Sequence, residues 1–248
     1  MALSISIAAR SVALLMGATL AAGGHETAAG AMEVDYQAIV ASADRSEADR
    51  KIDERREPAQ LLAFTGVAPG MKALEIGAGR GYTAELLARA VGPTGMVYAQ
   101  NTKPRDEFTE RLKKPVMANV TAVIRPFEDP VPPEARGLDL ITVILIYHDI
   151  TYMPVDREKM NRQLFDALKP GGRLVIVDHS AKAGTGTSVG KTLHRIEETT
   201  LRQEIEAAGF KLETEGDFLR DPADQREAPF REMSDMVTDR FALRYVRP

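Results

Sequence analysis

The sequence has 248 residues, with 32 Lys and Arg against 36 Asp and Glu, which gives a formal net charge of −4. This balance argues against a protein that binds nucleic acid regardless of its sequence, because such binding depends on a surplus of basic side chains. The hydrophobic fraction of 44% and the charged fraction of 27% are ordinary for a globular chain, so disorder is excluded as the main state. Cysteine is absent, which excludes disulfides, thiolate metal sites and a cysteine nucleophile.

The first 31 residues differ in composition from the rest of the chain. They contain one basic residue, Arg10, then an apolar run over residues 11–22 and the small residues 29–31. A basic region, an apolar region and a small-x-small cleavage site predict a signal peptide over residues 1–31 and an exported, periplasmic protein. The apolar run is shorter than the roughly 20 residues that span a bilayer, so no membrane span is predicted. An Ala-rich leader without a targeting role, or a start placed too early, is the alternative, and it implies a cytoplasmic protein.

Residues 32–248 are predicted to form a single domain, because no internal repeat or linker divides them. In chain order, the segments predicted as helices are 36–56 (one or two helices), 59–64, 83–91, 104–113, 156–168 and 193–208. The predicted strands are 73–76, 95–100, 120–124, 138–146, 173–178, 211–218 and 241–246. Strands that alternate with helices predict an α/β fold with a doubly wound, Rossmann-like sheet and helices on both faces. We expect seven strands, mostly parallel, with an antiparallel closing strand.

A glycine-rich segment, residues 75–82, follows the first predicted strand and opens the next helix. Its three glycines allow backbone amides to approach a ligand closely, at a helix N-terminus that favours negative charge. The third glycine comes one residue too early for the G-x-G-x-x-G pattern of dinucleotide folds. Glu75, two residues before the first glycine, would repel a pyrophosphate and suits a ligand with a cationic amino group. A tight turn that binds no ligand is the alternative.

This E-x-G-x-G-x-G segment resembles the first motif of class I S-adenosylmethionine-dependent methyltransferases, and residues 168–173 resemble that family's turn before strand five. The resemblance covers about residues 59–218. More narrowly, residues 147–149, 177–180 and 193–195 resemble a group of uncharacterised bacterial predicted methyltransferases, several with leader peptides. The resemblance implies S-adenosylmethionine as the cofactor and methyl transfer as the reaction.

Carried over by position, the resemblance implies that Gly77, Gly79 and Gly81 line the methionine part of the cofactor and that Glu75 acts near its amino group. The family usually has an acid after strand two that binds the ribose hydroxyls. Here that position is Asn101, whose amide can still bond the hydroxyls but lacks the charge.

A second pair of cofactor-binding residues is implied after the third predicted strand. Phe127 and Glu128 fall where an acidic side chain of the family typically meets the adenine amine. The alternative is that Glu128 and its neighbour Asp129 are solvated acids of a surface loop. The resemblance therefore implies one cofactor site built from the ends of three strands.

Histidines follow the fourth and fifth predicted strands, where ligands of open α/β sheets bind. We predict that His148 is the catalytic base or positions the methyl acceptor, with Asp149 or Tyr147 orienting it. A structural capping role is the alternative for His148. His179 and His194 can equally serve only to pin the loop between them.

A metal site is a further alternative at this edge of the sheet. It would combine His148, His179 and His194 with Asp178 or Glu197, because imidazole and carboxylate suit a divalent ion. The spacing matches no known zinc pattern, so the sequence predicts no metal.

The sequence thus predicts a methyltransferase with a small-molecule acceptor and no nucleic-acid partner. One alternative is a non-catalytic module that binds S-adenosylmethionine or S-adenosylhomocysteine, which Asn101 and the leader favour because the cofactor is made in the cytoplasm. A nucleotide-dependent oxidoreductase is the other, and the glycine spacing and Glu75 argue against it. The acceptor and the oligomeric state do not follow from the sequence.

Overall fold

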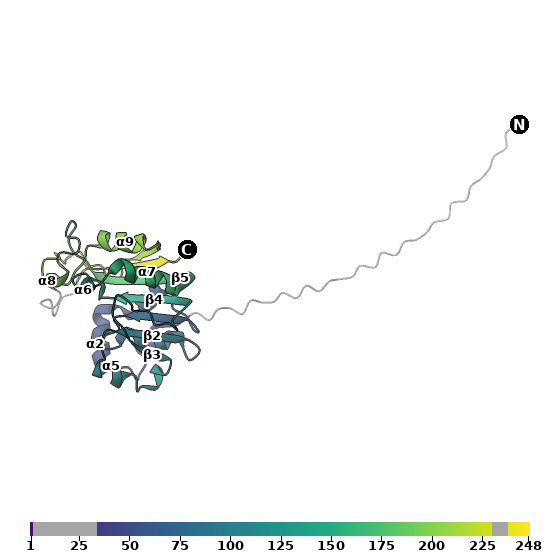
Figure 1. The fold of residues 1–248 in the computed structure, drawn as a ribbon. Coiled ribbons are helices and arrows are strands. Elements are labelled where there is room, and N and C mark those ends of the chain that lie inside the picture. Colours follow the sequence, from purple (N-terminus) through teal and green to yellow (C-terminus); the bar gives the residue numbers. More distant parts are fainter. Residues whose placement is uncertain (2–33, 230–237) are drawn as a thin grey trace. The chain divides into compact units, whose positions relative to one another are not determined.

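The computed structural model describes Met1, residues 34–229 and residues 238–248, so the predicted leader lies outside the described residues (Figure 1). Residues Val34–Pro248 form one compact unit. Within the described ranges, no helix has the length and apolar character needed to cross a bilayer.

A seven-stranded sheet forms the centre of this unit, in the order β3-β2-β1-β4-β5-β7-β6. Its strands are β1 (Lys72–Ile76), β2 (Met96–Asn101), β3 (Val120–Ile124), β4 (Leu138–Ile144), β5 (Leu168–His179), β6 (Lys211–Gly216) and β7 (Arg240–Val246). β1 to β5 pair in parallel, whereas β7 is antiparallel to both β5 and β6. The predicted doubly wound, mostly parallel sheet with an antiparallel closing strand is therefore confirmed.

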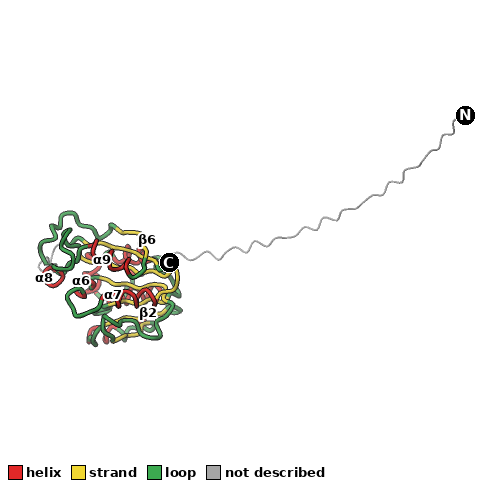
Figure 2. Tube along the Cα trace, turned by 45° about the horizontal axis from the view of Figure 1, so that its top comes forward, coloured by secondary structure: helices red, strands yellow, loops and turns green. Residues whose placement is uncertain are grey.

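Helices cover both faces of the sheet (Figures 1 and 2). They are α1 (Tyr36–Ala41), α2 (Glu47–Arg56), α3 (Pro58–Thr65), α4 (Tyr82–Val91), α5 (Asp106–Arg111), the 3-10 helix η1 (Pro115–Met117), α6 (Tyr147–Ile150), α7 (Arg157–Ala167), α8 (Gly190–Leu193) and α9 (Glu198–Ala207). One apolar core lies between the sheet and α7 and α9, and a second lies under α4. In α7, Met160 and Leu164 are four residues apart and point into the first core, and Asp156 caps the helix by accepting from the Lys159 amide.

Two predicted elements differ from the observed ones at the edge of the sheet where the histidines lie. The apolar run 138–146 stops being a strand at Ile144, because Leu145 takes a left-handed φ of 56° and α6 begins two residues later. The predicted helix 193–208 is two helices, because His194 is also left-handed (φ 53°) and Arg195 turns inward to pair with Asp224.

A further difference lies at the amino end of β5, where residues 168–173, which resemble the family's turn before strand five, are already part of the strand. Gly171 donates to the Arg247 carbonyl and Arg247 donates to the Gly172 carbonyl, so the C-terminal segment extends the sheet alongside this stretch. The register with β4 shifts between Leu138 and Leu140 to absorb the irregularity. Local turn chemistry was therefore overridden by pairing with a distant strand.

The centre of the sheet contains the point where the winding reverses. β1 is followed outward by β2 and β3 on one side, and β4 is followed by β5 on the other. Ligands of such sheets bind in the crevice beyond the carboxyl ends of the strands at this point. Here the glycine-rich segment follows β1 and α6 follows β4, so both predicted functional segments lie at one edge.

Candidate functional site

The glycine-rich loop after β1 requires glycine at three positions for two different reasons. Gly77, Gly79 and Gly81 all have left-handed φ values, of 68°, 59° and 82°. A Cβ on Gly77 would lie 2.9 Å from Cγ1 of Ile146, and one on Gly81 would lie 2.7 Å from Cε2 of Phe108. A Cβ on Gly79 would meet nothing nearer than the Gly77 carbonyl at 3.9 Å. Gly79 is therefore the position at which the loop leaves room beside its backbone.

Two buried amides at the end of β2 hold this loop in place. The Gly77 amide donates to Oε1 of Gln100 (2.9 Å), while Nε2 of Gln100 donates to the Arg125 carbonyl (2.6 Å). The Gly79 amide donates to Oδ1 of Asn101 (2.8 Å), and Nδ2 of Asn101 donates back to the Gly79 carbonyl (3.2 Å). Asn101 thus fixes the loop, and its contact with the ribose hydroxyls stays a prediction.

Glu75 lies beneath the loop with an exposed fraction of only 3%. Burial raises the pKa of its carboxyl to about 7, although hydrogen bonds from Thr83 and the Ala84 amide and the charge of Arg56 oppose the rise. Its Oε2 atom is buried without a hydrogen-bond partner. A buried carboxylate oxygen that lacks a donor fits a ligand with a cationic amino group.

The N-terminal helix α2 is anchored to the helix that follows the loop. The Tyr82 hydroxyl donates to Oδ1 of Asp53 (2.6 Å), and Arg45 donates to both oxygens of Asp53 (2.6 and 2.7 Å). The guanidinium of Arg56 lies over the Tyr82 ring, 5.1 Å from its centroid. The charged segment at residues 36–56 was predicted from the sequence as one or two helices. In the structure it covers the start of α4.

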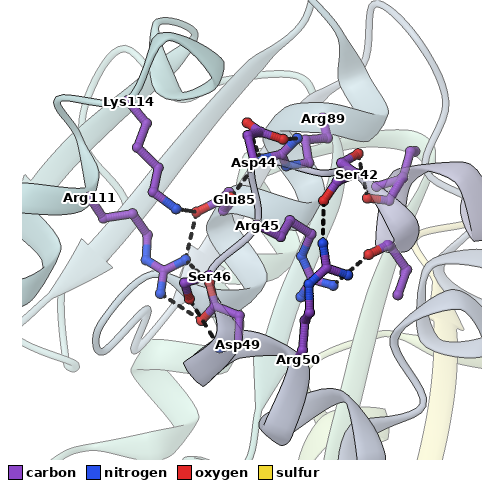
Figure 3. Close-up of polar contacts among 12 residues, drawn as sticks. Ser42, Asp44, Arg45, Ser46, Asp49, Arg50, Glu85, Arg89, Arg111 and Lys114 are labelled. Atoms are coloured by element: carbon purple, nitrogen blue, oxygen red, sulfur yellow. Dashed lines mark hydrogen bonds and ion pairs between the residues drawn. The ribbon is translucent and has the colours of Figure 1, made fainter.

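A second set of ion pairs joins the same helices (Figure 3). Arg111 of α5 contacts Asp49 of α2 and Glu85 of α4, and both carboxylates are buried. Glu85 also pairs with Arg89 and Lys114. These contacts fix α2, α4 and α5 around the glycine loop.

The two residues predicted near the adenine lie in different environments. Phe127 is buried in the core on the side of α7 and α9, whereas Glu128 is exposed. Asp129 pairs with Arg125. Adenine binding by Phe127 and Glu128 stays a prediction.

A cluster of histidines and carboxylates lies at the carboxyl ends of β4 and β5. His148 of α6 is buried, with Nδ1 2.5 Å from Oδ1 of Asp178 and Nε2 3.2 Å from Oδ1 of Asp149. The same Asp149 oxygen lies 2.8 Å from Nδ1 of His194 and accepts from the Tyr152 hydroxyl at 2.9 Å. Two imidazoles and a phenol therefore converge on one carboxylate oxygen.

The charges in this cluster perturb one another strongly. Burial lowers the pKa of His148, but the adjacent Asp178 and Asp149 outweigh burial and raise it to about 10. Burial and the positive charges of His148 and Arg240 hold the pKa of His179 well below its usual range. Its Nδ1 lies 2.8 Å from the Thr238 hydroxyl. The pKa values of His148 and His179 are thus shifted in opposite directions although their ring centroids are 5.6 Å apart.

The structure corrects one of the predicted catalytic residues. The Tyr147 hydroxyl donates to Oε2 of Glu204 (2.7 Å) and accepts from Nδ2 of Asn161 (2.8 Å), so it lies in the core and does not orient His148. Asp149 contacts His148, and its role in orienting a catalytic His148 stays a prediction. Adjacent residues of the short helix α6 point in different directions, which separates Tyr147 from the cluster.

Sequence reasoning missed the roles of Asp178 and Gln100. Asp178 accepts from the backbone amides of His148 and His179 in addition to the His148 ring, and it is fully buried. In both cases a polar residue at the end of an otherwise apolar parallel strand indicates a functional position. The groups that Asp178 and Gln100 contact could not be identified before the strand order was known.

Known methyltransferases are similar to this chain in sequence. A family model described as a methyltransferase domain matches residues 48–215. The ubiquinone/menaquinone biosynthesis C-methyltransferase of Cupriavidus taiwanensis is 30% identical over 122 residues, which cover 48% of this chain and 47% of the relative. The protein-L-isoaspartate O-methyltransferase of Aeropyrum pernix is 34% identical over 119 residues, which cover 47% of this chain and 42% of the relative. The chain thus spans about half the length of the curated relatives it matches.

Solved structures share the fold at lower sequence identity. A SAM dependent methyltransferase from Aquifex aeolicus superposes with a TM-score of 0.58 at 21% identity, covering 87% of this chain and 100% of the other. The geranyl diphosphate C-methyltransferase of Streptomyces coelicolor gives a TM-score of 0.59 at 15% identity, covering 87% and 88%. Because the family model matches more than half of the sequence, the chain belongs to the methyltransferase domain family, whose cofactor is S-adenosylmethionine.

Proposed function

We propose that the protein methylates a small-molecule acceptor that binds beyond the carboxyl ends of β4 and β5. The observation that carries this proposal is the adjacency of two segments across the reversal point of the sheet. Ile146, two residues before His148, packs against the backbone of Gly77. The glycine loop and the histidine cluster are therefore neighbours, as methyl transfer between two bound molecules requires.

The residues around the loop fit S-adenosylmethionine. Glu75 offers a buried carboxylate oxygen without a donor, which suits the methionine ammonium group, and the backbone at Gly79 has space beside it. When bound, the cofactor supplies a methyl group on a positively charged sulfur. The role of the protein is to hold the cofactor and the acceptor in line. Such positioning accounts for much of the reduction of the activation barrier in reactions between two molecules.

His148, Asp149 and His194 are the residues positioned for the acceptor. His148 is held between two carboxylates, so its role is to fix Asp149 rather than to move. Asp149 and His194 are less buried than His148 and are therefore more open to an acceptor. We assign Asp149 and His194 to acceptor binding and His148 to their positioning.

Calorimetry with S-adenosylmethionine, S-adenosylhomocysteine and NAD(P) tests the proposal. Binding of the first two ligands but not of NAD(P) is expected. Binding of NAD(P) instead would indicate the oxidoreductase alternative. His148→Ala should keep its affinity for S-adenosylhomocysteine and lose methyl transfer; unchanged affinity together with unchanged turnover would refute a role for His148.

We also propose export of the protein, on the basis of the leader composition at residues 1–31. N-terminal sequencing of the protein from its native host tests this. A mature chain that begins near residue 32 is expected, and an intact leader would contradict export by this route.

A further inference from the structure

We infer that His148, Asp149 and His194 bind a divalent transition-metal ion. Each offers one ligand atom, and these atoms all lie within 4.8 Å of one another. These are the residues that the proposed function assigns to the acceptor side of the site, and binding of the metal is measured with the metal alone, without an acceptor.

The spacing of the donor atoms fits a single ion. Oδ1 of Asp149 lies 3.2 Å from Nε2 of His148 and 2.8 Å from Nδ1 of His194. Imidazole nitrogens and carboxylate oxygens bind an ion such as Zn²⁺ at about 2.0–2.2 Å, so two ligands of one ion lie roughly 3–4 Å apart. The 3.2 Å separation lies in this range and the 2.8 Å separation is slightly shorter, so the donors need to move apart by only a few tenths of an ångström to share an ion.

The fold brings the third donor to the other two by a close helix approach. His194 is 45 residues beyond Asp149 and follows α8 in a left-handed conformation. A Cβ on Gly190, the first residue of α8, would lie 2.8 Å from the His148 carbonyl. Glycine at 190 thus allows α8 to pack on α6 and to present His194 to Asp149.

The buried carboxylate of Asp178 contacts the second ring nitrogen of one proposed ligand, His148. Oδ1 of Asp178 lies 2.5 Å from Nδ1 of His148, and Oδ2 accepts from the His148 amide at 2.8 Å. Metal-binding histidines nearly always use their second ring nitrogen in this way, which fixes the tautomer and directs the other nitrogen to the metal. Asp178 therefore directs Nε2 of His148 toward Asp149 and the proposed ion.

The donor set indicates the class of ion. Two imidazoles and one carboxylate suit Zn²⁺, Fe²⁺ or Co²⁺, whereas Mg²⁺ and Ca²⁺ prefer oxygen ligands. This set of ligands differs from the metal site considered as an alternative from the sequence, which also included His179 and either Asp178 or Glu197. His179 contacts Thr238 through Nδ1, and Glu197 accepts from the Gly186 amide. Neither is part of the His148, Asp149 and His194 group.

The test is metal binding by the isolated protein after removal of metals with a chelator. Titration with Co²⁺, followed by its visible absorption, and with Zn²⁺, followed by calorimetry, should each give one ion per chain. His194→Ala and Asp149→Asn should weaken metal binding at least ~100-fold. Even replacing a residue that only hydrogen-bonds to a metal ligand lowers metal affinity about 10- to 100-fold. Both side chains are partly exposed, so we expect these variants to fold.

His179→Asn is the matched control, because it removes a neighbouring histidine that is outside the proposed ligand set. It should keep the affinity of the unaltered protein, with the fold of every variant checked by circular dichroism. Failure of the unaltered protein to bind Zn²⁺ or Co²⁺ in a one-to-one ratio would overturn the inference. Equal loss of binding in His179→Asn and His194→Ala, or no loss in His194→Ala, would also overturn it.

Discussion

Arg111 donates to both carboxylate oxygens of Asp49, at 2.7 and 2.8 Å, across 62 residues of sequence. The same guanidinium contacts Glu85 at 2.6 Å and donates from Nε to the Arg80 carbonyl at 2.8 Å. Arg80 belongs to the glycine loop. A single side chain of α5 therefore links α2, α4 and the loop predicted to bind the cofactor.

Replacing Arg111 with Met should destabilise the protein by about 3–5 kcal/mol, the usual cost of removing one partner of a buried ion pair. Asp49 has an exposed fraction of 2%, and without Arg111 its burial would oppose its negative charge with less compensation. Urea unfolding measures the loss. The double variant Asp49→Asn with Arg111→Met should recover part of it, and Lys113→Met, which removes an exposed pair, should have little effect. No recovery in the double variant would contradict this assignment.

Glu75→Gln should change how stability depends on pH. The pKa of Glu75 is raised from 4.5 to about 7 in the folded protein, so the folded state binds the proton more tightly than the unfolded state. Its contribution is fully present below pH 4.5 and is lost as pH rises through about 7. The stability of Glu75→Gln relative to the unaltered protein should thus increase by about 3 kcal/mol between pH 4 and pH 8.

Unfolding of both proteins in urea at several pH values measures this difference. Glu54→Gln, an exposed change on α2, is the control and should show no such trend. The affinity for S-adenosylmethionine should in turn rise with pH through about 7, because the ionised carboxylate is the form that attracts an ammonium group. A stability difference that does not vary with pH would contradict the burial of an ionisable Glu75.

Gly77→Ala should weaken cofactor binding and stability together. Alanine at a φ of 68° costs about 1–2 kcal/mol, and its Cβ would press on Ile146 at 2.9 Å. Gly137→Ala is the control with a similar φ of 62°, because no atom lies within 4 Å of its Cβ. It should lose a similar strain energy but no affinity for S-adenosylhomocysteine. Equal affinities of the two variants, measured by calorimetry, would argue against a role for the loop in binding.

Asn101→Ala should loosen the glycine loop. It removes two hydrogen bonds to Gly79, each worth about 1 kcal/mol, so the loss in unfolding free energy should be about 2 kcal/mol with a parallel loss of cofactor affinity. Asn101→Asp keeps the acceptor for the Gly79 amide but sets an oxygen against the Gly79 carbonyl. Calorimetry should show weaker cofactor binding in this variant too. Tighter binding would mean that contact with the ribose outweighs support of the loop.

The sequence by itself determined the fold and the place of the cofactor loop. Strands such as β1 and β4 are apolar runs bounded by turn residues, and the glycine segment is a local pattern in which each residue's role depends on its neighbours in the chain. These features depend on short-range steric effects and on which face of an element is buried, and both can be predicted from residues that are close together in the sequence.

Only the tertiary structure decided which distant side chains meet. The contacts of His148 with Asp178, of Asp149 with His194 and of Arg111 with Asp49 join residues 30, 45 and 62 positions apart. The direction of Tyr147 into the core depended on the chain leaving the strand at Leu145 and starting α6 at Tyr147, although the apolar run continues through these residues. Such pairings are set by strand order and helix packing, because a buried charge is tolerated only beside a partner and no local pattern contains that partner.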